Sequence, residues 1–229
     1  KDVDFKGVVY RIKDLGNLKL VENTYDKQDY INNKLNIQFK KYKTWIAAST
    51  HTNEEVFCAK AHIELKKKNK NLITIIIPRH VHRVQDIISQ IQKLNLKVVT
   101  HSSKMKTLKN VDIYIVDTFG DSQKFFKISN TVLMGKFLIT KGSQNPLEAV
   151  RYGAKILHGP NFDNFTDIFK LLKSLKISKR ITSIRQLITE ITFKKDMRRG
   201  LKIKKIGVLI LKKTLKELEI YINNEPKKT

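Results

Sequence analysis

The chain has 229 residues, of which 41% are apolar, so it is long enough for one large domain with appendages and a substantial hydrophobic core. No apolar run approaches the roughly 20 residues that a membrane-spanning helix needs, and no secretory signal is visible. A single cysteine, Cys58, excludes an internal disulfide and fits a reducing compartment.

The net charge of +25 comes from 46 basic and 21 acidic residues. Such a charge favours polyanionic partners: nucleic acid, an anionic membrane face or phosphorylated substrates. The 38 lysines and 8 arginines equally fit a compositional bias of solvated surfaces. Because no arginine cluster with stacking aromatics, helix-turn-helix or zinc pattern is present, specific nucleic-acid binding is not expected.

Residues 1–43 are the least regular part of the chain. We expect a short strand at 8–10, a turn at 16–20 that leads into an extended piece, and a helical stretch around 28–41. The polar, lysine-rich composition of residues 22–43 is typical of a connector.

From Thr44 the pattern alternates between strand and helix. The run at 72–77 is continuous and β-branched, which suits a central parallel strand buried on both faces. Strands are expected at 45–49, 72–77, 96–100, 111–116, 131–134 and 155–157. Helices are expected at 54–68, 84–94, 122–128, 146–152, 165–175, 184–191 and 196–222. The pattern predicts an α/β fold with a Rossmann-like parallel sheet. We expect three parts: 1–43 as connector, 44–195 as the ligand-binding domain and 196–229 as a basic C-terminal helix.

Ligands of such sheets lie beyond the carboxyl ends of the strands. Polar loops are expected at that edge: Ser49-Thr50-His51, Pro78-Arg79-His80, residues 117–121 and residues 142–148. The guanidinium of Arg79 matches phosphate oxygens, because its donors form a fork. No GxGxxG or GxxxxGK[ST] pattern occurs, which disfavours ordinary dinucleotide or P-loop binding.

The stretch 141–149 is predicted to start a helix. Asn145 is a suitable cap and Pro146 fits the first helical position. The helix N-terminus so formed offers donors and a partial positive charge to a phosphate, and Glu148 could accept hydrogen bonds from sugar hydroxyls. An ordinary cap without a ligand fits these residues equally well.

Taken together, the loops resemble the 3-deoxy-D-manno-octulosonic acid (Kdo) transferases of lipopolysaccharide synthesis. Six motifs occur in the family's order: Gly16-Asn17-Leu18-Lys19; Ala47-Ala48-Ser49-Thr50-His51 with Glu54-Glu55; Pro78-Arg79-His80 with Arg83; Asp117-Thr118-Phe119-Gly120-Asp121; Asn145-Pro146-Leu147-Glu148; and Gly159-Pro160-Asn161 with Asn164-Phe165. Each motif alone is weak, but their order across residues 16–165 is specific.

The resemblance implies the C-terminal domain of a GT-B glycosyltransferase, which binds the donor CMP-Kdo. It implies that Arg79 and His80 face the phosphate and sugar of the donor, and that the loop at Gly120 and Asp121 lies against the cytidine. It also implies that Asn145 and Glu148 hold the phosphate and ribose side. Thr50, His51 and Gln144 are expected to line the cleft, although Thr50 and His51 could instead only cap the first helix.

In this family an N-terminal domain holds the acceptor lipid IVA and supplies a glutamate as general base. The enzymes are inverting transferases on the cytoplasmic face of the inner membrane. Because Gly16-Asn17-Leu18-Lys19 marks the end of that half, this chain is expected to be a fragment that lacks the acceptor domain, the glutamate and the membrane anchor. Its basic tail would touch anionic lipid or simply pack across the domain.

Three departures from the family are visible. The chain has Met134-Gly135-Lys136 where the family usually reads Gly-Gly-Ser, and Gly142-Ser143-Gln144-Asn145 where it reads Gly-Gly-His-Asn. Asp121 stands in place of a glutamate. These changes fit a decayed or split gene, so two alternatives to an active donor half remain: a non-catalytic remnant that at most binds CMP, and a basic module that binds polyanions. We expect no cofactor or metal, and Cys58 is expected in the core.

Overall fold

The computed structural model describes residues 2–5, 8–11, 13–21, 31–103, 107–136, 138, 144–160 and 165–224. The chain divides into two compact units. The larger comprises Lys27–Gly200, and the smaller comprises Lys1–Asp26 together with Leu201–Thr229.

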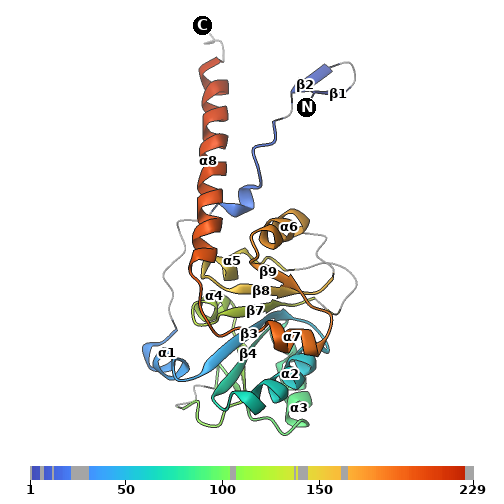
Figure 1. The fold of residues 1–229 in the computed structure, drawn as a ribbon, viewed down its shortest axis with the longest axis vertical. Coiled ribbons are helices and arrows are strands. Elements are labelled where there is room, and N and C mark those ends of the chain that lie inside the picture. Colours follow the sequence, from blue (N-terminus) through green and yellow to red (C-terminus); the bar gives the residue numbers. More distant parts are fainter. Residues whose placement is uncertain are drawn as a thin grey trace. The chain divides into compact units, whose positions relative to one another are not determined.

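A parallel sheet forms the centre of the larger unit (Figure 1). Its seven described strands lie in the order β5-β6-β4-β3-β7-β8-β9, and every neighbouring pair is parallel. In chain order the strands are β3 (Lys43–Thr50), β4 (Leu72–Pro78), β5 (Val98–Thr100), β6 (Ile113–Ile115), β7 (Thr131–Met134), β8 (Lys155–His158) and β9 (Ser178–Arg180). The predicted α/β, Rossmann-like fold is therefore confirmed.

Helices cover both faces of this sheet (Figure 1). α2 (Glu54–Lys68), α3 (Val84–Gln92) and α7 (Ile184–Glu190) pack together on one face. α4 (Ser122–Phe126) and α5 (Leu147–Arg151) pack together on the other, and α6 (Thr166–Ser174) contacts β9. α1 (Asn33–Phe39) precedes β3, and a 3-10 helix, η2 (Val81–Arg83), leads into α3.

The strand order reverses at β3. From β3 the chain builds β4, β5 and β6 on one side, and then crosses to build β7, β8 and β9 on the other. β3 therefore has β4 as one neighbour and β7 as the other. In doubly wound sheets such a reversal opens a crevice at the carboxyl ends of the strands, which is where ligands bind.

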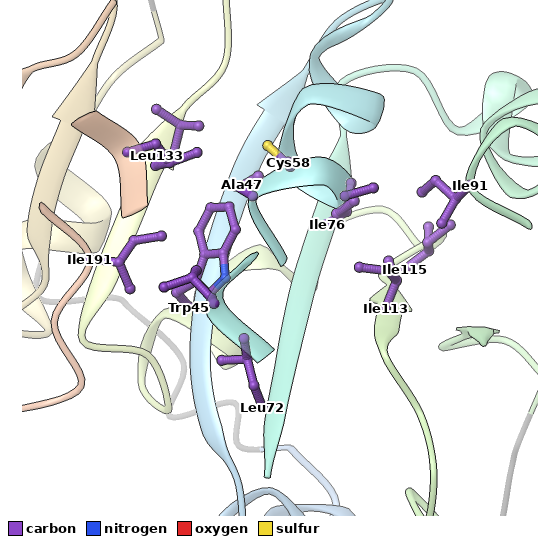
Figure 2. Close-up of a cluster of buried hydrophobic side chains, with 14 of the residues drawn as sticks. Trp45, Ala47, Cys58, Leu72, Ile76, Ile91, Ile113, Ile115, Leu133 and Ile191 are labelled. Carbon is purple, nitrogen blue, oxygen red and sulfur yellow. The ribbon is translucent and has the colours of Figure 1, made fainter. Parts of the chain in front are cut away.

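The core consists of aliphatic side chains around the two central strands (Figure 2). Every residue of β4 is buried, as its continuous β-branched sequence predicts. Trp45 on β3 is fully buried. Cys58 lies in this core as expected, and burial raises the pKa of its thiol well above the usual value.

The structure differs from the predicted elements in several places, and strand β1 (Asp2–Phe5) is one element that was not predicted. Residues 18–20 do not form an extended piece but a 3-10 helix, η1 (Leu18–Leu20), because the Asn17 side chain accepts a hydrogen bond from Lys19 N–H and caps it. Strand β9 was not predicted, because its sequence Ser-Lys-Arg has no apolar alternation. β9 lies at the edge of the sheet, where a strand does not need alternating apolar residues.

The smaller unit contains an antiparallel pair, β1 (Asp2–Phe5) and β2 (Val8–Arg11), together with η1 and most of α8 (Arg198–Asn224). Glycines allow close approach within it: a Cβ on Gly207 of α8 would lie 2.4 Å from the carbonyl oxygen of Leu20. Gly16 has φ of +103° and lies against Ile210.

A buried polar cluster joins α2 to the sheet. His62 is fully buried, and its Nδ1 lies 2.9 Å from the hydroxyl of Thr74. Its Nε2 lies 3.5 Å from Asp112, which also accepts hydrogen bonds from Lys66 Nζ and Lys97 N–H. Burial alone would raise the pKa of Asp112, but the bonds from His62, Lys66 and Lys97 hold it well below its usual range. Burial lowers the pKa of His62, which keeps the ring neutral.

We predict that Asp112→Asn lowers the free energy of unfolding at pH 7 by about 1–3 kcal/mol, the value of hydrogen bonds to a charged group. A carboxyl whose pKa is lowered by folding stabilises the protein above its unfolded pKa, near 4, and loses that effect as pH falls. Urea denaturation should therefore show the difference from wild type shrinking below about pH 4. Asp86→Asn, at an exposed site on α3, is the control and should change stability by less than about 1 kcal/mol. An equal loss at pH 7 and pH 3 would contradict the assignment.

Candidate functional site

Four polar loops lie along the carboxyl edge of the sheet. They follow β6, β4, β3 and β7, which are consecutive neighbours in the sheet. Adjacent strands lie about 4.8 Å apart, so the ends of β4 and β7, on either side of β3, are separated by about 10 Å. The loop after β4 carries Arg79 and His80, and the loop after β7 leads towards Asn145. A small ligand can therefore contact both loops at once.

Glu54, the first residue of α2, ties the β3 loop to the β7 loop. Its side chain is fully buried. Oε2 accepts hydrogen bonds from the N–H groups of His51 at 2.9 Å and Lys136 at 3.0 Å, and Oε1 accepts one from Leu138 N–H at 3.0 Å. Because the bonds reach residues 51, 136 and 138, this carboxylate fixes both loops that border the crevice.

The backbones of these two loops come unusually close. A Cβ on Gly135 would lie 1.9 Å from the carbonyl oxygen of Ser49, so only glycine fits there. Ser49 and Lys136 both have left-handed backbones, with φ of 55° and 66°. Non-glycine residues adopt this region at a cost, which the surrounding bonds must offset. Met134, the last residue of β7, is buried and adds no bulk to the crevice surface.

Glu55 fixes the position of Arg83. The guanidinium of Arg83 donates to both carboxylate oxygens of Glu55, at 3.1 and 3.3 Å. Glu55 also accepts a hydrogen bond from the hydroxyl of Thr50 at 2.9 Å. Thr50 has no exposed surface, so its side chain does not line the proposed ligand site but is buried beside Glu55. Nor does it cap α2, since that helix has no side-chain cap at Asn53.

Cationic side chains gather around His51. Its ring meets the His80 ring edge to face, with centroids 5.8 Å apart, and His80 lies 5.6 Å from His82. The pKa of His51 lies below its usual value, first because the ring is partly buried. The remaining causes are nearby positive charges: Lys136, His80, Arg83 and Arg79. Its Nε2 is buried and has no hydrogen-bond partner among the described residues.

Arg79 and His80 are exposed immediately beyond β4. The backbone N–H of Arg79 donates to the carbonyl oxygen of Thr50 at 3.0 Å, which holds the two loops together while the guanidinium reaches solvent. The cations of the β3, β4 and β7 loops thus share one corner of the sheet edge. An anion is the natural ligand of such a corner.

The loop after β6 is held by hydrogen bonds from Ser102, which follows β5, and by bonds of its own. Asp117 accepts from the N–H and hydroxyl of Ser102. Asp121 accepts from the hydroxyl of Thr118 and pairs with Lys124 at 2.7 Å. Burial would raise the pKa of Asp121, but these two bonds lower it below its usual range. Asp121 is therefore ionised and engaged within its loop.

The tip of this loop projects outward. Gly120 has φ of +82°, and open space surrounds the position of a Cβ. Phe119 beside it is 86% exposed. A large apolar ring displayed so openly offers a flat surface to a planar ligand group.

Asn145 lies just before α5, whose N-cap residue is Pro146 and not Asn145 as predicted. The Oδ1 of Asn145 accepts a hydrogen bond from Leu147 N–H at 3.1 Å. Asn145 is exposed, and Gln144 and Glu148 are partly buried. α5 begins at Leu147, one residue later than predicted, and has only five residues, so its dipole is a weaker attraction for an anion than that of a long helix. Residues 141–143 and 161–164 lie outside the described residues.

Glu54 and Arg83 entered the sequence analysis only through the family resemblance, although they form the framework of this corner. The signal was two adjacent acidic residues opening a helix, which is also typical of simple dipole stabilisation. Within the described ranges no group of three or more His, Cys, Asp or Glu side chains could hold a metal ion. No described helix is both long and apolar enough to cross a bilayer.

Known proteins with similar sequences are Kdo transferases. The chain is 29% identical over 158 residues to the 3-deoxy-D-manno-octulosonic acid transferase of Haemophilus influenzae, covering 69% of this chain and 37% of that protein. It is 27% identical over 212 residues to the Rickettsia conorii transferase, covering 91% of this chain and 46% of that protein. It is 31% identical over 157 residues to the Rickettsia typhi transferase, covering 68% of this chain and 34% of that protein. The chain therefore spans about a third to a half of the length of these relatives. No family model matches it.

Among solved structures, the C-terminal CMP-Kdo binding domain of WaaA from Acinetobacter baumannii has a similar fold. The TM-score is 0.63 at 19% identity, covering 77% of this chain and 91% of that domain. The larger unit therefore has the fold of that Rossmann-like domain, a parallel sheet with helices on both faces. The sequence matches show that the chain belongs to the Kdo transferase family.

We predict that Glu54→Gln destabilises the fold by about 1–3 kcal/mol, because an amide N–H₂ would face backbone donors that now meet a carboxylate oxygen. Hydrogen exchange of the Lys136 and Leu138 amides should accelerate more than that of core amides. Glu64→Gln is the matched control, since Glu64 is exposed on the same helix and makes only a surface pair with Lys67. Equal effects of the two substitutions would show that Glu54 does not tie the loops.

Proposed function

We propose that this chain is the donor-binding half of a Kdo transferase and holds CMP-Kdo in the crevice at the β3/β7 reversal. The observation that carries the proposal is the gathering of cations around His51. The donor contributes two anionic groups, the phosphate of CMP and the carboxylate of the ulosonic acid. Arg79 and His80 are exposed in this corner whereas the carboxylates of Glu54 and Glu55 are buried, so its accessible side chains suit such a ligand.

Arg79 is the proposed phosphate ligand. It is exposed directly above the crevice, and its planar fork can donate two parallel hydrogen bonds to phosphate oxygens. His51 and His80 lie beside it. An anion bound there would raise the low pKa of His51 by offsetting the surrounding charges, and the unpartnered Nε2 could then donate to it.

The cytidine is proposed to lie between the β6 loop and the start of α5. Glu148 would accept hydrogen bonds from ribose hydroxyls, and Asn145 would lie on the phosphate side. Gly120 provides open space for the nucleotide, and Asp121 keeps the loop in shape through its bonds to Thr118 and Lys124. Gln144, partly buried just before Asn145, retains hydrogen-bonding capacity for the sugar.

The reaction would be an inverting transfer to lipid IVA. A hydroxyl of the acceptor sugar attacks the anomeric carbon of Kdo, while the bond to the CMP oxygen breaks. Arg79 and the neighbouring histidines would stabilise the negative charge that develops on the departing phosphate. Removal of the acceptor proton requires a general base, which the family places in its N-terminal half.

Peripheral attachment to an anionic membrane face is proposed through α8. This 27-residue helix carries exposed leucines and many lysines, among them Leu201, Leu209, Lys204 and Lys212. Apolar side chains beside basic ones are typical of helices that lie in a lipid interface, where each Lys or Arg near the surface adds about 1 kcal/mol.

A non-catalytic remnant that binds CMP is the second candidate. The observation that favours it is the short α5 helix, which weakens the phosphate side of the site. A basic module that binds any polyanion is the third, and only the overall charge supports it.

We predict saturable, 1:1 binding of CMP to the chain by titration calorimetry. Arg79→Ala should weaken it about 10- to 100-fold, because a charge-assisted bond contributes about 1.5–3 kcal/mol. Glu148→Gln should weaken it by several-fold. Lys60→Ala is the control, since it removes one positive charge from an exposed position on α2.

If Arg79→Ala and Lys60→Ala weaken binding equally, and affinity falls steeply with salt, the polyanion interpretation replaces the donor site.

An assay of Kdo transfer distinguishes an active donor-binding half from a non-catalytic remnant. We predict that the chain, mixed with the N-terminal half of a family member, transfers Kdo from CMP-Kdo to lipid IVA, and that Arg79→Ala lowers the rate at least tenfold at subsaturating donor. Product would be followed by mass spectrometry. CMP binding without any product in the mixture would leave the remnant as the better description.

A further inference from the structure

A cavity lies around the edge strand β9, apart from the loops around His51. Its volume is about 680 Å³. It is bounded by α6, β9, the start of α7 and the end of β8, and it shares no lining residue with the loops around His51. Cavities of this size hold small molecules or the polar part of larger ones.

Four positively charged side chains converge on this cavity: Lys170, Lys173, Lys179 and Arg180. None of the described residues that line it is an Asp or a Glu. In the described part of the chain none of the four forms an ion pair, whereas other cations do, such as Arg83 with Glu55 and Lys155 with Glu190. Charges of one sign that face a common space repel each other, and an anion bound there would relieve the repulsion.

Ser178 adds an unsatisfied hydroxyl. It is the first residue of β9, is only 8% exposed and lines the cavity. Its Oγ is buried and makes no hydrogen bond within the described residues. A buried hydroxyl without a partner is costly, so the position favours a ligand oxygen that can accept its proton.

The rest of the wall is apolar and well packed. The His158 ring packs against Phe169 with centroids 4.5 Å apart, and its Nδ1 lies 2.7 Å from the carbonyl oxygen of Gly159. At the far end, Gln186 accepts hydrogen bonds from the N–H and hydroxyl of Thr182. These contacts give the cavity a fixed shape, so the cations and the hydroxyl of Ser178 face a preformed space.

We propose that this cavity is a binding site for a phosphate group, separate from the donor crevice. Phosphate carries more charge than a carboxylate and has more acceptor oxygens, so it can meet Arg180, the lysines and the Ser178 hydroxyl together. The ligand is a phosphate monoester or diphosphate, either free in solution or at the head of an anionic lipid.

Titration of inorganic pyrophosphate into the Arg79→Gln chain tests the site, since this background weakens any binding in the crevice. We expect saturable binding that Lys173→Gln/Arg180→Gln weakens at least tenfold and Ser178→Ala weakens about two- to fivefold. The hydroxyl of Ser178 has no partner among the described residues, so we expect its loss to leave the fold unchanged. Lys60→Gln/Lys70→Gln, at exposed positions, removes the same charge elsewhere and should weaken binding less than twofold.

Equal weakening by the two double variants, or no saturable binding of pyrophosphate, would overturn the proposal. The source of the phosphate is tested with vesicles of phosphatidylcholine containing phosphatidic acid, whose headgroup is a phosphate monoester. If the Ser178→Ala and cavity double variants also bind these vesicles more weakly than the control, the site takes a lipid headgroup. If they match the control on vesicles but lose pyrophosphate, it takes a soluble phosphate.

Discussion

The site depends on one buried carboxylate. Glu54 accepts three backbone hydrogen bonds from the loops after β3 and β7, at the point where the strand order reverses. Without it, the close approach of Gly135 to Ser49 and the left-handed backbones of Ser49 and Lys136 would have no evident support. The chain thus buries the Glu54 carboxylate and leaves Arg79 and His80 exposed at the same edge of the sheet.

Most of the fold could be predicted from the sequence because its signals are local and strong. The β-branched run of β4 and the helix α2 were both located almost to the residue. β9 escaped prediction because an edge strand needs no apolar pattern, and η1 because one asparagine side chain can turn an apparent extended piece into a 3-10 turn. In both cases a contact formed only in the folded chain decides the local structure.

The candidate site could be predicted less well. The sequence indicates which loops reach the carboxyl edge, and the strand order places them side by side. It does not indicate that Thr50 is fully buried beside Glu55, or that His51 lies near the basic side chains of Lys136, His80, Arg83 and Arg79. Those facts depend on how α2 packs on the sheet, which no spacing of residues encodes. The cavity at β9 was missed for the same reason, since its lysines look like ordinary surface charge in the sequence.

The central claim is that a nucleotide phosphate binds between Arg79 and the start of α5. A crystal structure of the chain with CMP tests it most directly. The account predicts the phosphate within hydrogen-bonding distance of the Arg79 guanidinium, with the ribose hydroxyls near Glu148. CMP bound elsewhere, for example against Ser178 and Arg180, with the crevice left to solvent, would contradict it.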